Sequence, residues 1–392
     1  MSYNLKEINN DLNSLIIFKN LKYSPAFQAL MRLNGDYNVV KSYSEFISSI
    51  ISNNLNFTEY VKDLVFTDEN IYTSLICNKK DVDFLKEQLD LELSKIYKIS
   101  TLEKSDFPEQ VINNFRIFPT YSEDFSNEYF ERIKTISKTG FGVFANNYVF
   151  HVDNNGDLKA TESYNIRKLK NIYSYDRERQ KVIENTKALV EGKPCCNVLL
   201  YGDAGTGKSS SIKAIASENF KEGLRLIEVE TSQITTIPDI VSKLANNPLK
   251  FIIFIDDITF SSDDPNFCAL KTILDGNSKG LPSNVSVYAT SNHRHLIKET
   301  TSDREGDVVN ANDNIQDIMG LCARFGLCIT FTKPDRYQFA DIVTSLADEK
   351  GLEYNRDKLL IKAEAYAIRN GGRTPRCAGQ FIDLVYSGIE KI

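Results

Sequence analysis

The sequence predicts an α/β fold in which helices cover both faces of a parallel sheet. Three observations lead to this prediction. Short apolar runs alternate with helical periodicity after residue 196. The first of these runs leads directly into a glycine-rich loop, and the chain before residue 136 shows helical spacing instead. The expected strands are Asn197–Tyr201, Leu224–Val229, Phe251–Asp256, Val285–Thr290 and Leu327–Phe331.

The composition is typical of a globular protein in water, and the length of the chain predicts two or three domains. The chain has 392 residues, of which 42% are hydrophobic and 26% charged. Its net charge of −6 argues against a broad nucleic-acid-binding face, so nucleic acid is a possible partner but not a favoured one. No apolar run reaches the roughly 20 residues of a membrane span. The first residues lack the features of a signal peptide, and we expect a cytoplasmic protein.

Cysteine and histidine usage does not favour a metal site. The seven cysteines contain no Cys-x-x-Cys pair, and there are only three histidines. Structural zinc sites need closely spaced ligand pairs, so we expect most of these thiols to be small core residues.

The region before the sheet divides into two parts. Residues 1–135 form a helical domain, as the spacing of Leu5, Ile8 and Leu12 indicates. Its aromatic residues are expected in the core rather than on a ligand-binding face. Residues 136–165 contain two alternating runs, Phe141–Ala145 and Tyr148–Val152, which predict a β-hairpin or small meander followed by a linker.

The glycine-rich loop has the spacing Gly-x-x-x-x-Gly-Lys-Ser. An apolar strand precedes it and an amphipathic helix, Lys208–Glu218, follows it, which is the context that a phosphate-binding loop needs. The alternative is a glycine-rich turn without a ligand. The residues expected to hold the phosphates of ATP are Gly202, Asp203, Ala204, Gly205, Thr206, Gly207, Lys208, Ser209 and Ser210.

Two carboxylates follow the apolar strand Phe251–Ile255. In an open parallel sheet this strand end lies beside the phosphate loop. We expect Asp256 to hold Mg²⁺ together with the Ser209 hydroxyl, and Asp257 to orient or deprotonate the attacking water. The alternative is a pair of solvated acids. Most ATPases of this type carry Glu at the second position, so the shorter Asp257 leaves the hydrolysis rate open.

Three later polar residues complete the candidate site. Asn292 follows a strand and is expected to position the lytic water, although Asn is also a common turn cap. Arg324 precedes the last strand and is expected to reach the γ-phosphate bound by an adjacent subunit; a surface ion pair is the alternative. Arg376 follows Pro375 at a helix start and is expected to point toward the nucleotide, with Arg373 as second choice.

In this order, these motifs resemble those of the AAA+ ATPases over residues 166–392. Asp256-Asp257 and Arg324-Phe325-Gly326-Leu327 are also similar to a bacterial group described only as domain of unknown function 815. The resemblance implies a sheet of order 5-1-4-3-2 in an ATPase domain, residues 166–333, followed by a helical lid, residues 334–392. It also implies a ring-forming homo-oligomer that uses ATP and Mg²⁺, and contacts of Ile172 and Tyr173 with the base. The polar stretch Lys298–Ile318 departs from the pattern; a solvated loop is favoured there over a partner contact.

Four functions are compatible with these motifs. The first is an oligomeric motor or remodeller that hydrolyses ATP and acts on an unknown protein client. The second is a slow switch in which ATP binding controls a partner, and the third is a DNA-associated ATPase similar to a helicase loader. A small-molecule kinase is the least favoured, because such kinases lack the finger and lid arginines.

Overall fold

The computed structural model describes residues 5–34, 38–52, 56–118, 124–161, 166–260, 264–275, 281–292, 320 and 323–391. They form two compact units, Met1–Asn146 and Asn147–Ile392. Each unit is described by itself. The finer division at residues 135, 165 and 333 remains a prediction. Within the described ranges, no helix is both long and apolar enough to cross a membrane.

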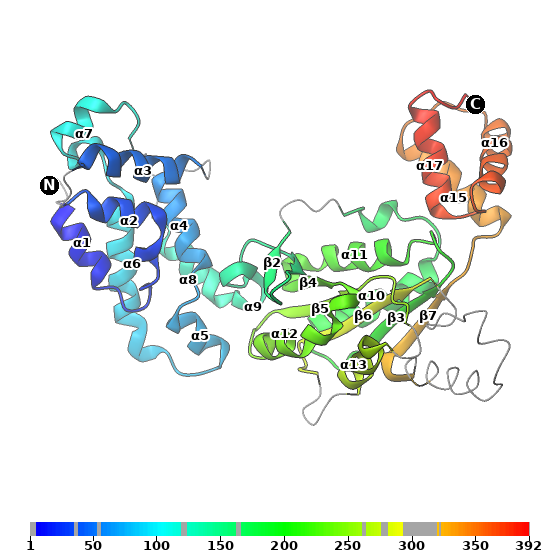
Figure 1. Ribbon diagram of the computed structural model, residues 1–392, viewed down its shortest axis with the longest axis horizontal. Helices are drawn as coiled ribbons and strands as arrows, with labels where there is room; N and C mark the ends of the chain where they lie inside the picture. Colours follow the sequence, from blue (N-terminus) through cyan, green and yellow to red (C-terminus); the bar gives the residue numbers. More distant parts are fainter. Residues whose placement is uncertain are drawn as a thin grey trace. The chain divides into compact units, whose positions relative to one another are not determined.

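The first unit is helical, as predicted (Figure 1). Its core is aromatic: Tyr43, Phe46, Phe57 and Phe107 are buried and pack ring against ring. Its α-helices are α1 (Leu5–Asn13), α2 (Pro25–Arg32), α3 (Val39–Ile51), α4 (Phe57–Thr67), α5 (Ile71–Cys77), α6 (Lys86–Ser100), α7 (Glu109–Asn114), α8 (Ser126–Lys134) and α9 (Ile136–Thr139). Short 3-10 helices lie at Leu21–Tyr23, Asp83–Leu85, Lys104–Asp106 and Gly142–Phe144.

A buried carboxylate fastens the loop after α1. The side chain of Glu92 in α6 is 1% exposed and accepts hydrogen bonds from the backbone N–H groups of Ile16, Ile17 and Phe18. Gln88 donates a further hydrogen bond to it. Burying a carboxylate is costly unless it is fully hydrogen-bonded, so these donors compensate the charge.

The second unit is built on a sheet of seven strands in the order β2-β1-β4-β5-β6-β3-β7. The strands that were predicted, numbered along the chain, have the order 5-1-4-3-2 from β7 to β4, as the resemblance implied. Residues Phe254 and Tyr288 on neighbouring strands illustrate the parallel register. The five strands are β3 (Asn197–Gly202), β4 (Leu224–Val229), β5 (Lys250–Ile255), β6 (Val285–Ser291) and β7 (Gly326–Phe331).

The predicted hairpin is corrected in its strands and in its place. The hairpin is formed by β1 (Val149–Val152) and β2 (Leu158–Ala160), and β1 pairs in parallel with β4, so both strands extend the main sheet. The run Phe141–Ala145 is not a strand, because Gly140 and Gly142 have φ of 72° and 57° and the chain forms a 3-10 helix there. Left-handed glycines interrupt an extended ladder whatever the apolar alternation around them.

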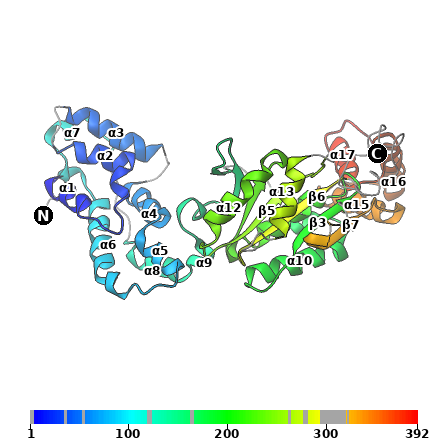
Figure 2. The same ribbon diagram turned by 60° about the horizontal axis from the view of Figure 1, so that its bottom comes forward.

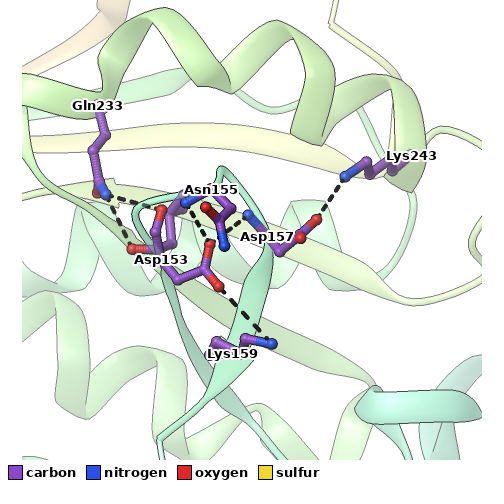
Figure 3. Close-up of polar contacts among 7 residues, drawn as sticks. Asp153, Asn155, Asp157, Lys159, Gln233 and Lys243 are labelled. Carbon is purple, nitrogen blue, oxygen red and sulfur yellow. Dashed lines mark hydrogen bonds and ion pairs between the residues drawn. The ribbon is translucent and has the colours of Figure 1, made fainter.

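Side-chain contacts fix the turn between β1 and β2 to the neighbouring helix (Figure 3). Asp153 accepts a backbone hydrogen bond from Asp157 at 3.0 Å and lies 3.8 Å from the Lys159 ammonium. Gln233 donates to the backbone carbonyl oxygens of Val152 and Asp153 at the end of β1. Lys243 of helix α12 (Ile237–Leu244) lies 3.3 Å from Asp157. The added hairpin is thus tied to the segment that follows β4.

Helices cover both faces of the sheet. In Figure 1, α11 lies on one side, and α12 and α13 lie on the other; Figure 2 gives the view from below. Val182, Ile212 and Phe254 belong to one core cluster, which places α10 and α11 on the same face. These helices are α10 (Asp176–Val190), α11 (Lys208–Glu218), α12 (Ile237–Leu244) and α13 (Pro265–Leu274), with 3-10 helices at Leu169–Asn171, Phe220–Glu222 and Thr231–Thr236.

A three-helix lid follows β7. It consists of α15 (Arg336–Glu349), α16 (Arg356–Arg369) and α17 (Pro375–Tyr386) around its own apolar core. The Thr374 hydroxyl accepts from the backbone N–H of Cys377 and caps α17, with Pro375 in the first turn. This cap sets where the preceding loop and Arg376 lie.

Candidate functional site

The glycine-rich loop connects β3 to α11 and requires glycine for two reasons. Gly202 has φ of 125°, and a Cβ there would lie 2.3 Å from the Phe331 carbonyl oxygen, so no larger residue fits. Gly205 and Gly207 have φ of 74° and 91°, which side-chain-bearing residues rarely adopt. The turn delivers the chain to the N-terminus of α11, where backbone N–H groups and the helix dipole favour an anion.

Lys208 stands at the first position of α11 and is 5% exposed. Its ammonium donates to the carbonyl oxygens of Gly202 and Asp203, at 3.1 and 2.8 Å, and to Asn292 Oδ1 at 2.8 Å. Burial lowers the pKa of the ammonium below its ordinary value of 10.5, although the carboxylates of Asp257 and nearby acids oppose this shift. The loop therefore holds a desolvated cation ready to pair with an anion.

Ser209 and Asp256 meet at the end of β5. The Ser209 hydroxyl donates to Asp256 Oδ1 at 2.6 Å. The Thr290 hydroxyl, at the end of β6, donates to the same oxygen at 2.5 Å. Hydroxyl and carboxylate oxygens are the donor atoms that Mg²⁺ prefers, so these residues fit the metal site predicted for Ser209 and Asp256.

Asp257 has an unusual backbone that two contacts support. Its φ is 52°, in the left-handed region, and its N–H donates to the Thr290 hydroxyl at 2.8 Å. Its Oδ1 accepts from the Asn292 side-chain amide at 2.7 Å. Asn292 therefore links Asp257 and Lys208 through the two ends of its amide.

Most of the predicted residues surround one cavity of about 230 Å³. The cavity is polar, and Arg376 from the lid completes its wall. Its lining residues are Gly205, Gly207, Lys208, Ser209, Ser210, Asp256, Asp257, Thr290, Asn292 and Arg376. Of the predicted loop residues, Gly202, Asp203, Ala204 and Thr206 do not line it.

Sequence reasoning did not single out Thr290 as a site residue. It holds Asp256 with its hydroxyl oxygen as donor and Asp257 with the same oxygen as acceptor. The signal was its place at the end of a strand next to Asn292 on the edge where Asp256 was expected. A hydroxyl there can satisfy a carboxylate and a backbone N–H together.

The other arginines lie elsewhere. Arg373 pairs with Glu364 of α16, which leaves Arg376 as the lid arginine at the cavity. Arg324 does not line the cavity and forms an ion pair with Asp275 at the end of α13. This position agrees with an arginine that cannot serve its own cavity, and it equally fits a surface ion pair.

Ile172 and Tyr173 line a separate cavity of about 1000 Å³, not the one at the loop. Ile342 and Ser345 of the lid helix α15 line the same space. The Tyr173 hydroxyl donates to Glu349 at 3.1 Å, which joins this segment to the lid. A role for Ile172 and Tyr173 in base binding remains a prediction, as do the roles of all site residues. The stretch Lys298–Ile318, the predicted polar loop, lies outside the described residues.

Comparisons with known proteins place this geometry in a family. Residues 144–389 match the family model described as "Protein of unknown function (DUF815)". Replication factor C small subunits of Thermoplasma volcanium and Thermoplasma acidophilum are 36% and 34% identical over 107 residues. That match covers 25% of this chain and 32% of theirs, so the chain spans about a third of the length of these relatives.

Among solved structures, the RuvB Holliday junction branch migration motor of Thermotoga maritima is similar at a TM-score of 0.39 and 17% identity. The match covers 56% of this chain and 64% of that one. The family model spans more than half of the chain and begins just before β1, so it includes the whole seven-stranded sheet and the lid. The chain therefore belongs to the DUF815 family.

Proposed function

We propose that the chain binds ATP with Mg²⁺ in the 230 Å³ cavity and hydrolyses it to ADP. The observation that carries this proposal is the convergence of Lys208, Ser209, Asp256, Asn292 and Arg376 on one cavity from four different segments of the chain. A triphosphate needs positive charge and N–H donors, a metal needs oxygen donors, and this cavity offers both.

The loop residues bind the phosphates. Backbone N–H groups between Gly205 and Ser210 would point at the triphosphate, and the N-terminus of α11 adds positive potential. Lys208 exchanges its present acceptors for the β- and γ-phosphate oxygens, which are stronger acceptors because they are charged. Arg376 closes the cavity from the lid side.

Ser209 and Asp256 would hold the cation. They lie within hydrogen-bond distance of each other and contribute oxygen ligands. When bound, Mg²⁺ neutralises charge on the phosphate oxygens. Thr290 keeps the Asp256 carboxylate in one orientation, which favours a defined coordination geometry.

Asp257 acts on the attacking water. Its carboxylate is one methylene shorter than that of Glu, and Asn292 fixes its orientation. We infer that Asp257 orients the water and accepts its proton, while Asn292 holds the water and the carboxylate in register. The reach of this short side chain determines whether the protein is a motor or a slow switch.

An adjacent copy would complete the site. Arg324 lies away from its own cavity, so a homo-oligomer in which it reaches the neighbouring γ-phosphate accounts for its place. An arginine supplied in trans is worth roughly 10³–10⁵ in rate. The client on which such an assembly acts is a further protein that the residues do not identify.

The test of the proposal is ATP binding by Lys208→Ala. This variant should bind ATP at least about tenfold more weakly, because a buried charged hydrogen-bond donor is lost. The matched control is Lys193→Ala, which removes a lysine whose side chain is 68% exposed and paired with Glu191. Equal affinity of Lys208→Ala and the wild type would refute the proposal.

A second candidate is a DNA-associated ATPase, and the replication factor C relatives favour it. The net charge of −6 weighs against it. Binding of duplex DNA with an affinity that falls steeply as salt rises would support this candidate.

The protein client can be sought in a pulldown with Asp257→Asn as bait in the presence of ATP. This variant should hold ATP without turnover.

A further inference from the structure

The side chain of Asp203 is directed at the start of the lid, not at the phosphates. Its Oδ2 accepts the backbone N–H of Lys333 at 2.9 Å, and its own N–H donates to the Phe331 carbonyl oxygen at 2.9 Å. Phe331 ends β7, and Lys333 belongs to the linker that leads into α15. The second residue of the phosphate loop thus holds the chain at the point where the ATPase core passes into the lid.

Tyr175 holds the same linker from another side. Its hydroxyl donates to the Thr332 carbonyl oxygen at 2.6 Å, and its ring packs against Phe331 with 4.9 Å between centroids. Ser174 and Tyr175 have φ of 66° and 62°. Two consecutive left-handed residues with side chains are strained and persist only where contacts hold them. Burial, with the nearby Asp203 carboxylate, raises the pKa of the Tyr175 phenol, so it remains a donor.

The linker also contacts the loop that precedes α17, the lid helix that carries Arg376. The Lys333 ammonium donates to the Gly371 carbonyl oxygen at 3.1 Å, in the loop before α17. The Arg376 N–H donates to the Gly205 carbonyl oxygen at 3.2 Å. The loop therefore contacts the linker through Asp203 and Lys333, and it contacts the lid itself through Gly205 and Arg376.

A carboxylate in a phosphate-binding loop needs an explanation. If the Asp203 carboxylate pointed at the triphosphate, the two negative charges would repel each other. Asp203 does not line the cavity. Directed at a backbone N–H, the same charge makes a hydrogen bond roughly twice as strong as a neutral acceptor does. The position therefore suits holding the linker better than binding the nucleotide.

We propose that Asp203 is a positioning residue: by holding the N–H of Lys333, it sets the lid so that Arg376 faces the phosphates. This inference rests on the proposed ATPase function, and it assigns to Asp203 a task different from phosphate binding. The loop backbone binds the phosphates, and the Asp203 side chain couples the loop to the lid. Tyr175 supports the same linker in parallel.

The first experiment needs no nucleotide. Hydrogen–deuterium exchange over residues 332–340 should show one additional fast-exchanging amide in Asp203→Ala, because the Lys333 N–H loses its acceptor. Asp203→Asn keeps a neutral acceptor oxygen, so this amide should exchange more slowly in Asp203→Asn than in Asp203→Ala. Unchanged exchange in Asp203→Ala would overturn the proposal.

The second experiment is a double-mutant cycle with Arg376→Ala, read as ATP affinity and turnover. Each single alanine variant should lose about tenfold in kcat/KM. The double variant should be no worse than Arg376→Ala alone, because Asp203 acts through Arg376. Asp203→Asn should restore most of the loss.

Several outcomes decide the matter. Multiplied losses in the double variant, or an Asn variant as weak as the Ala variant, would overturn the positioning role while leaving the ATPase proposal intact. ATP binding that is unaffected by Lys208→Ala would overturn both. If Asp203→Ala fails to fold, Tyr175→Phe takes its place in the cycle. It removes only the hydroxyl that holds Thr332, and it should lose less than Asp203→Ala but through the same non-additive pattern.

Discussion

The side-chain amide of Asn292 donates to Asp257, with 2.7 Å between Nδ2 and Oδ1. Its carbonyl oxygen accepts from the Lys208 ammonium at 2.8 Å. One side chain thus joins the residue proposed to act on water with the residue proposed to bind phosphate. A strand-end turn cap would need neither contact.

This bridge predicts a separation of turnover from binding in Asn292→Ala. The turnover number should fall roughly 10²-fold, as expected when a positioned group is lost, while the ATP dissociation constant changes little. Phosphate release and equilibrium titration with a fluorescent ATP analogue measure the two quantities. Asn78→Ala, an exposed asparagine in the first unit, is the control. Normal turnover in Asn292→Ala would leave Asn292 as a turn cap only.

The left-handed backbone at Asp257 predicts which replacements fold well. Asn tolerates φ of 52°, so Asp257→Asn should change the free energy of unfolding by less than about 0.5 kcal/mol. Asp257→Val should cost about 1–2 kcal/mol, because a β-branched residue is strained there. Thermal unfolding checks both. Asp257→Asn should also bind ATP and lose hydrolysis; retained turnover would assign the water to another group.

The Arg324–Asp275 ion pair predicts two distinguishable variants. Asp275→Ala should leave turnover near the wild-type rate, because an exposed ion pair contributes little and Arg324 remains. Arg324→Ala should still bind ATP but lose turnover by roughly 10³-fold or more. Mixing Arg324→Ala with Lys208→Ala subunits should partly restore hydrolysis. The Lys208→Ala subunit supplies an intact Arg324, and the Arg324→Ala subunit supplies an intact phosphate-binding loop. Equal effects of both single variants would favour the surface ion pair.

The lowered pKa of Lys208 predicts a pH dependence of ATP binding. Phosphates favour the charged ammonium and raise its pKa in the complex, while burial lowers it in the free protein. Affinity is therefore constant below the pKa of the free protein. Above it, binding takes up a proton, and affinity falls by up to about tenfold per pH unit. Titrations from neutral to alkaline pH check this, and Lys208→Arg, whose charge persists, should not show the fall.

Because the Glu92 carboxylate is buried and hydrogen-bonded, we expect its removal to destabilise the first unit strongly. Glu92→Ala removes the acceptor of three backbone N–H groups and should cost about 3 kcal/mol or more. Glu92→Gln keeps one acceptor oxygen and should cost less. Glu87→Ala, on the exposed part of the same helix, is the matched control. Chemical denaturation monitored by tyrosine fluorescence measures the differences.

Local sequence signals predicted the strands of the second unit well. For the apolar runs around Val198, Ile253 and Val287, the predicted first and last residues lie within two residues of those of the observed strands. Helix α11 has the predicted bounds, Lys208–Glu218. Strand order followed from the resemblance, because parallel pairing is a long-range property that short windows do not contain. Pro375 indicated the start of α17, since proline fits the first turn of a helix.

The remaining features depend on contacts between distant segments. The pairing of Phe150 with Ile227 brings β1 into the sheet across more than 70 residues of chain, and alternation alone does not name the partner. Thr290 becomes important only because the strand ends bring it to Asp256. The hydrogen bond between Asp203 and Lys333 likewise spans 130 residues, and the loop motif does not predict it.

The parallel pairing of β1 with β4 bears on how the second unit can be produced alone. A fragment that begins at residue 166, where the resemblance to AAA+ ATPases begins, would lose β1 and β2 and leave β4 as an open edge with unpaired backbone groups. Such an edge is a template for intermolecular strand pairing. A fragment that begins at Asn147 keeps the edge strands in place. We expect the shorter fragment to aggregate during expression, and its inactivity would then say nothing about the nucleotide site.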